Sequence, residues 1–164
     1  MISYDFETWG LHENAEIISL GVVKFDPLVR DSYPTLVERG QQWFFDGSAQ
    51  HGRTRGREAI EFWEKMGGAP ELIDPEAYLF HESLDDFIDE HVNEMWVSKG
   101  WKDPMWFDQL FPKTISYRNF LDMRSIMFAK NASKYANPPK GHKNNRHSAL
   151  HDAAAQAWQI QRSY

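Results

Sequence analysis

Two carboxylates stand two residues apart near the start of the chain, in the stretch Y-D-F-E-T-W (4–9). The alternation of aromatic residues with Asp5 and Glu7 is typical of a β-strand, which places both acids on one face. Carboxylates that close repel one another, and solvent, a Lys or Arg neighbour, or a hard cation such as Mg²⁺ relieves the repulsion. The same spacing recurs in a predicted loop, at residues 74–76. By spacing alone, a solvated strand and a metal site explain the pair about equally well.

A second candidate group opens the last predicted helix, in H-S-A-L-H-D-A-A-A (147–155). Five helical residues turn about 500°, so His147 and Asp152 share a site only if the histidine lies at or before the helix start. Small residues around the acid permit a close approach to a sheet; they are Ala149, Ala153 and Ala154. Taken separately, a histidine in a surface loop and an acid favoured by the helix dipole explain these two residues better.

The elements that must position these groups form an α/β pattern. The helix over 82–92 is the clearest, because Leu84, Phe87, Ile88 and Val92 follow helical spacing. Three early strands with short connections indicate an antiparallel meander, and the alternation that follows predicts a mixed sheet. Strands are predicted at 2–7, 17–25, 42–46, 95–98 and 115–120, and helices at 57–66, 82–92, 122–131 and 148–162, with a loop over 137–146.

The composition is that of one globular domain, predicted to span residues 1–164. Hydrophobic residues make up 41% of the chain and aromatic residues 15%, which excludes a disordered protein. The net charge of -6 argues against a protein that coats nucleic acid, but not against a metal-dependent enzyme that acts on it. The absence of cysteine excludes disulfides, thiolate metal sites and a cysteine nucleophile. With no membrane-spanning run and no room for a signal peptide, we expect a cytoplasmic protein of a bacterium or a phage-infected cell.

Together these motifs resemble those of the DEDDh 3′→5′ exonucleases, over nearly the whole chain. The matching residues are Asp5 and Glu7 in Y-D-F-E-T, Asp108 in M-W-F-D-Q-L, and His147 and Asp152 in H-S-A-L-H-D-A. The runs I-I-S-L-G-V-V-K-F-D, A-I-E-F-W, W-V-S-K-G and L-D-M-R-S are most similar to the compact branch that includes phage exonuclease A and a mycobacterial 3′→5′ exoribonuclease. Asp108 is preferred to Asp103 because it follows Phe107, as in the F-D of the family, whereas Asp103 is expected in a Lys-Asp-Pro turn.

The resemblance implies an RNase H-like mixed five-stranded sheet, three antiparallel strands followed by two parallel ones, flanked by helices. It implies two divalent ions, Mg²⁺ or Mn²⁺, held by Asp5, Glu7, Asp108 and Asp152, with His147 as general base. The implied reaction removes nucleoside 5′-monophosphates from the 3′ ends of single-stranded RNA or DNA. The resemblance leaves the sugar preference and the oligomeric state open, with a homodimer among the options.

Contacts to the substrate are less defined by the sequence. Trp9 stacks on the terminal base or closes one end of the core, and the two alternatives have equal support. Basic side chains in two stretches are candidate phosphate contacts or solvated loop residues; they are Arg53, Arg55 and Arg57, and Lys140, Lys143 and Arg146. Phe62 and Trp63 are expected in the core, and Asp122 and Arg124 in a local ion pair.

Three other functions stay open at this stage. An RNase H-like endonuclease has a similar metal site, and it differs in its ability to cut a circular or 3′-blocked strand. A nucleic-acid-binding or polymerase-associated module that has lost activity is disfavoured by the full set of four acids and a histidine. A scaffold for protein interaction is supported only by the acidic charge and the many aromatic residues.

Overall fold

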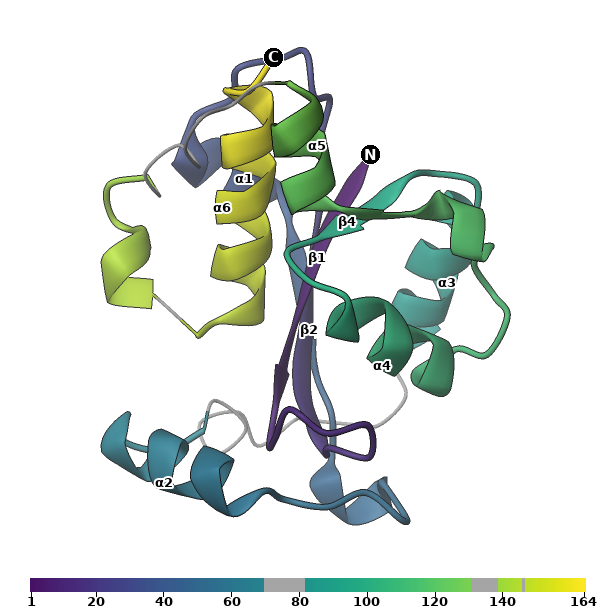
Figure 1. The fold of residues 1–164 in the computed structure, drawn as a ribbon, viewed down its shortest axis with the longest axis vertical. Helices are drawn as coiled ribbons and strands as arrows, with labels where there is room; N and C mark the ends of the chain where they lie inside the picture. Colours follow the sequence, from purple (N-terminus) through teal and green to yellow (C-terminus); the bar gives the residue numbers. More distant parts are fainter. Residues whose placement is uncertain (70–81, 131–138, 146) are drawn as a thin grey trace.

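A five-stranded mixed sheet runs through the molecule, with helices packed on both faces (Figure 1). The computed structural model describes residues 1–69, 82–130, 139–145 and 147–164. The strand order is β3-β2-β1-β4-β5. The pairs β1–β2 and β2–β3 are antiparallel, and the pairs β1–β4 and β4–β5 are parallel. This topology confirms the predicted mixed sheet of three antiparallel strands and two parallel ones.

The helices and strands have the following bounds. The strands are β1 (Ile2–Thr8), β2 (Ile17–Lys24), β3 (Gln41–Phe44), β4 (Trp96–Ser98) and β5 (Phe120–Asp122). The α-helices are α1 (Tyr33–Arg39), α2 (Arg57–Lys65), α3 (Glu82–His91), α4 (Lys102–Leu110), α5 (Met123–Ala129) and α6 (Ala149–Gln161). Short 3₁₀ turns are η1 (Gly47–Ala49), η3 (Tyr117–Asn119) and η4 (His142–Asn145).

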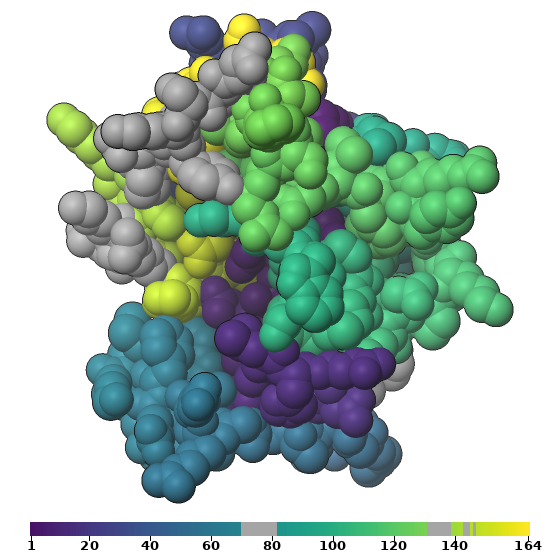
Figure 2. Space-filling view, viewed as in Figure 1, coloured from purple at the N-terminus to yellow at the C-terminus, as the bar shows by residue number. Residues whose placement is uncertain are grey.

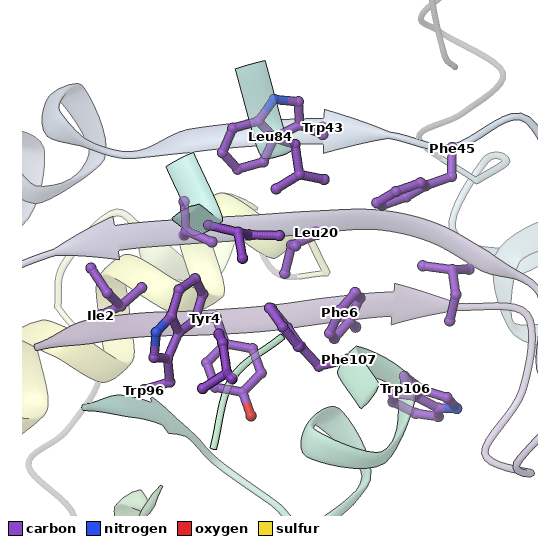
Figure 3. Close-up of a cluster of buried hydrophobic side chains, with 14 residues drawn as sticks. Ile2, Tyr4, Phe6, Leu20, Trp43, Phe45, Leu84, Trp96, Trp106 and Phe107 are labelled. Atoms are coloured by element: carbon purple, nitrogen blue, oxygen red, sulfur yellow. The ribbon is translucent and has the colours of Figure 1, made fainter. Parts of the chain in front are cut away.

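One face of the sheet packs against α3 and α4 through large aromatic side chains. Tyr4 and Phe6 of β1 point to this face and meet Phe107 of α4 edge to face, at ring-centroid distances of 5.8 and 6.3 Å (Figure 3). Edge-to-face pairs of this kind add to the stabilisation that burial itself gives. Because the aromatic residues of β1 take this face, the alternating acids Asp5 and Glu7 point to the other.

The opposite face packs against α1, α5 and α6, with α6 lying directly on the sheet. Gly21 of β2 permits this approach, because a Cβ added there would lie 2.2 Å from the main-chain nitrogen of Leu150. Small residues of α6 complete the contact; Ala149, Ala153, Ala154 and Ala157 are fully buried. The prediction that small residues bring the last helix close to the sheet is confirmed, and it carries Asp152 to the side of Asp5 and Glu7.

Most predicted elements lie where the structure has them, with ends that agree within two residues. The strand predicted at 115–120 is wrong, since β5 covers Phe120–Asp122 and is preceded by η3. Ser116 caps that turn by accepting a hydrogen bond from the main chain of Arg118, which removes these residues from the sheet. The helices α1 and α4 were not predicted, and the second omission affects the site. None of the helices among the described residues has the length and apolar character needed to cross a bilayer.

Candidate active site

Four acidic side chains from three elements meet at one end of the sheet. Asp5 and Glu7 come from β1, Asp103 from the first turn of α4, and Asp152 from the first turn of α6. The parallel strands β1 and β4 end at the same edge, so the chain that leaves β4 enters α4 beside the acids of β1. The Asp103 carboxylate accepts a hydrogen bond from the amide of Phe6, the residue between the two β1 acids, over 3.4 Å.

Crowding and burial shift the ionisation of these acids. Burial raises the pKa of Asp5 well above its ordinary value, and the neighbouring carboxylates of Asp103, Glu7 and Asp152 raise it further. A hydrogen bond from Gln156 Nε2 to Asp5 Oδ1, over 2.8 Å, acts in the opposite direction. Burial and then Asp152 and Asp103 raise the pKa of Glu7 to about 8, and burial raises that of Asp103 to about 6. A bound cation would relieve this repulsion, so the donor set fits a divalent ion.

His147 lies immediately before α6, where a shared site with Asp152 requires it. Its main chain has a φ of 63°, in the left-handed region, and its amide donates to Asp152 Oδ2 over 3.0 Å. Ligand atoms of Glu7, His147 and Asp152 lie within 4.8 Å of one another, which is the one such group of three among the described residues. The imidazole packs edge to face on Phe62 of α2, with ring centroids 4.8 Å apart.

The structure does not place Asp108 in this group, which corrects the choice made from the F-D motif. The Asp108 side chain is exposed and accepts a hydrogen bond from the main chain of Lys113. Asp103, which the sequence placed in a turn, lies in the first turn of α4; it is 8% exposed and its side chain faces β1. The Lys-Asp-Pro sequence begins a helix here, since a proline in the first turn has no helical hydrogen bond to lose.

Glu7, Asp103 and His147 line a cleft of about 1040 Å³. In the space-filling view, β1 in purple, α4 in green and the start of α6 in yellow-green meet near the middle of the visible face (Figure 2). Two aromatic side chains with large exposed areas line the cleft, Trp101 at 67% and Phe62 at 37%. The prediction that Phe62 belongs to the core is wrong, because its side chain is exposed, whereas Trp63 is buried as expected. Basic residues also line the cleft; they are Arg57, Lys99, Lys102 and Arg124.

Trp9 does not line this cleft, and its burial favours the second of its two predicted roles, closure of one end of the core. Its side chain is 6% exposed and packs with Ile18 and Trp63, while the Arg55 guanidinium lies 4.3 Å from its ring centroid. An irregularity in the register of β1 with β2 falls between Glu7 and Thr8. The extra residue at this point is Ile18 of β2, which is buried in the same small cluster as Trp9 and Trp63.

The predicted phosphate contacts fall into two groups. Arg53 donates to the carbonyl of Ala15, and Arg55 pairs with Glu16, so both hold the loop after β1. Arg57 is exposed and pairs with Glu61 on α2, and Lys140 is exposed. Arg146 lies outside the described residues, as does the side chain of Lys143. The expected ion pair between Asp122 and Arg124 is confirmed, with 2.7 Å between Oδ2 and Nη2.

Two residues at the site were missed in the sequence. Gln156 follows Asp152 by one helical turn, and this i, i+4 spacing is a signal that would have placed it beside Asp5. His142 lies ten residues before Asp152, and its Nε2 is 2.5 Å from Asp152 Oδ1. No helical or strand periodicity connects these two residues, because the chain turns through η4 between them.

Three comparisons with known proteins agree with this arrangement. A family model described as the 3′-5′ exoribonuclease Rv2179c-like domain matches residues 1–164. The exodeoxyribonuclease of Enterobacteria phage T4 is 34% identical over an alignment of 113 residues that covers 63% of this chain and 50% of that protein. The chain thus spans about half the length of this relative. The fold is similar to that of S. pombe Pop2p in its Mg²⁺- and Mn²⁺-bound form, with a TM-score of 0.63 and 12% identity over 98% of this chain and 81% of the other.

Proposed function

Because the chain belongs to the family of Rv2179c-like 3′-5′ exoribonuclease domains, we propose that it is a metal-dependent 3′→5′ exonuclease. It would hydrolyse the terminal phosphodiester of single-stranded RNA or DNA and release nucleoside 5′-monophosphates. The observation that carries the proposal is the cluster of four acids with His147, of which Glu7, Asp103 and His147 line the cleft. The identity to a phage exodeoxyribonuclease supports it.

The acids Asp5, Glu7, Asp103 and Asp152 would hold two divalent ions, Mg²⁺ or Mn²⁺. Carboxylate oxygens are the ligands that both ions prefer, and burial together with the neighbouring carboxylates of Asp152 and Asp103 raises the pKa of Glu7, a strain that a bound cation would relieve. The metal-bound form of the structurally similar Pop2p supports this assignment. Divalent ions, when bound, supply positive charge against the negative charge that develops on the phosphate during attack by water.

His147 would act as the general base that accepts the proton of the attacking water. An imidazole exchanges a proton near neutral pH, and this one lies within reach of the carboxylates of Glu7 and Asp152. The hydrogen bond from its main-chain amide to Asp152 and the contact of its ring with Phe62 hold His147 in position. The four carboxylates would supply the oxygen ligands, which would leave the imidazole for proton transfer.

The cleft would bind the 3′ end of the strand. Exposed aromatic rings suit unstacked bases, and Trp101 takes the role first predicted for Trp9. Lys99, Lys102 and Arg124 border the same cleft and provide positive charge for the backbone phosphates, in a protein whose net charge is -6. Backbone and base contacts of this kind recognise a single strand without reading its sequence.

Digestion of 5′-labelled single-stranded RNA and DNA, with Mg²⁺ or Mn²⁺ and with EDTA as control, tests the proposal. We expect a ladder of fragments that shortens from the 3′ end, and its loss in Asp5→Ala and Asp152→Ala. Wild-type rates in both variants would exclude the mechanism. The family description names an exoribonuclease and the phage relative is an exodeoxyribonuclease, so the two substrates run side by side decide the sugar preference.

Circular and 3′-blocked strands separate an exonuclease from an endonuclease. An exonuclease leaves both intact, whereas an endonuclease of the RNase H-like type cuts them. Binding of single strands without any metal-dependent digestion would instead identify a module that has lost activity.

A further inference from the structure

His142 touches the acidic cluster without belonging to it. Its Nε2 lies 2.5 Å from Oδ1 of Asp152, on the 3₁₀ turn η4. The ligand atoms that lie mutually close among the described residues are those of Glu7, His147 and Asp152, and His142 is not part of that group. Its contact is therefore with the acid and not with the space that the acids enclose.

The imidazole of His142 is held from several directions. Its ring is 8% exposed and packs edge to face on Tyr33 of α1, with centroids 6.2 Å apart. The Tyr33 hydroxyl in turn lies 2.7 Å from Nδ1 of His151, on α6. The main-chain amide of His142 donates to the carbonyl of Pro139. The position of the ring is thus fixed by α1, α6 and the turn itself.

Both oxygens of Asp152 are occupied by this segment. Oδ1 contacts His142 Nε2, and Oδ2 accepts from the amide of His147 over 3.0 Å. When the imidazole carries its hydrogen on Nε2, the first contact is a hydrogen bond to a carboxylate, which is stronger than one between neutral groups. The two bonds together fix the rotation of the carboxylate.

We propose that His142 is a positioning residue, which orients the Asp152 carboxylate toward Glu7 for a divalent ion. The inference rests on the proposed function in one respect, namely that the acidic cluster holds such an ion. Without His142, Oδ1 of Asp152 loses this bond and the carboxylate is less restrained. Loss of a partner that orients a metal ligand typically weakens metal binding about 10–100-fold.

Titration with Mn²⁺ by calorimetry, on the full chain, tests the assignment in three variants of His142. Glutamine carries an amide donor at about the reach of Nε2, whereas asparagine is too short and alanine has no donor. We expect His142→Ala and His142→Asn to weaken Mn²⁺ binding about 10–100-fold, and His142→Gln to stay within about threefold of the wild type. The Gln–Asn comparison is sufficient if the alanine variant does not fold.

Tyr33→Phe is the matched control, because it keeps the ring that packs on His142 and removes the hydroxyl that contacts His151. A melting temperature lowered without metal, together with unchanged Mn²⁺ affinity, is the expected result. Mn²⁺ affinity equal to the wild type in folded His142→Ala and His142→Asn would overturn the proposal. So would an equal loss of affinity in Tyr33→Phe, because metal binding would then respond to a change beside α6 that leaves the bond from His142 to Asp152 in place.

Parallel digestion of labelled single strands distinguishes this proposal from the proposed function. If the wild type binds Mn²⁺ but leaves 3′ ends intact, the exonuclease proposal fails while the loss of Mn²⁺ affinity in His142→Asn still supports positioning. If the wild type digests 3′ ends and all His142 variants bind Mn²⁺ equally, the positioning role fails and the function stands.

Discussion

Replacement of Asp103 by asparagine, with Asp108→Asn as its control, tests the composition of the acidic cluster. Both residues lie on α4, and both substitutions remove one negative charge from the same helix. Asp103 is 8% exposed and faces β1, whereas Asp108 is exposed and contacts only the main chain of Lys113 among the hydrogen bonds described for it. We therefore expect the two variants to differ in stability, metal affinity and activity.

The stability change follows from the pKa of Asp103. Its pKa is raised from 3.8 to about 6, and one pKa unit corresponds to about 1.4 kcal/mol. Well above pH 6, ionised Asp103 thus destabilises the metal-free folded protein by about 3 kcal/mol. Asparagine removes this charge but is a weaker acceptor for the amide of Phe6, which costs about 1 kcal/mol. The expected gain at pH 8 is about 2 kcal/mol, against a change within about 0.5 kcal/mol for Asp108→Asn.

The sign of the effect gives the experiment its pH control. A raised pKa in the folded state stabilises the protein below the unfolded value of 3.8, and this stability is lost as the pH rises through about 6. The gain in Asp103→Asn should therefore be present at pH 8 and absent at pH 4. Urea unfolding in EDTA, followed by tryptophan fluorescence, measures it at both pH values.

Metal affinity and activity should change in the opposite direction. The same variant loses a carboxylate ligand, so we expect weaker Mn²⁺ binding and a rate of 3′-end digestion lower by at least about 100-fold, or about 3 kcal/mol. Asp108→Asn should retain both. If Asp108→Asn abolished digestion and Asp103→Asn did not, the assignment of Asp103 would be wrong. A stability gain equal at pH 4 and pH 8 would refute its electrostatic origin.

Three further predictions follow from the packing and charge of the site. Trp101→Ala should raise the KM for single strands about tenfold or more without loss of stability, since stacking of a base is worth about 1–3 kcal/mol. Trp9→Ala, in contrast, should destabilise the fold by about 3–5 kcal/mol in urea unfolding, because this ring is buried. Gly21→Ala should destabilise the fold by about 1–3 kcal/mol or more, because the added Cβ would lie 2.2 Å from the main chain of α6. Gly56→Ala is the control, since the nearest atom to its added Cβ lies at 3.4 Å. Equal urea midpoints for the two variants would contradict the close approach of α6 to β2. Because folded Glu7 keeps its proton up to a pKa of about 8 while the unfolded chain loses it near 4.5, Glu7 by itself should lower metal-free stability by about 1.4 kcal/mol per pH unit between these values, and Asp103 should add to this fall below about pH 6. An increase of stability with pH would count against the raised pKa of Glu7.

The parts of the site that local pattern defines were predictable from the sequence. Alternation in β1 placed Asp5 and Glu7 on one face, because the aromatic residues between them take the other. Helical geometry required His147 to precede the last helix, and α6 does begin two residues later, at Ala149. In each case one element, with its own periodicity, sets the direction of the side chains.

The sequence favoured Asp108 over Asp103 because the choice relied on a motif and not on the face of a helix. Within α4, Trp106 and Phe107 follow Asp103 at i+3 and i+4, so all three lie on one side of the helix, and all three are buried. Asp108 follows Phe107 directly and points about 100° away from it. Once the Lys-Asp-Pro segment is treated as the first turn of a helix, the spacing itself selects Asp103.

The positions of the Trp9 and His142 side chains could not be predicted from the periodicity of any helix or strand. Trp9 directly follows β1 and is buried against Trp63, with ring centroids 6.5 Å apart, and against Ile18, the extra residue where the register of β2 with β1 shifts. An extra residue of this kind redirects side chains of the strand that carries it. His142 reaches Asp152 through a turn, and its place is set by packing on α1. Where an element ends, neighbours distant in the sequence decide the direction of a side chain, and these ends are where the site is built.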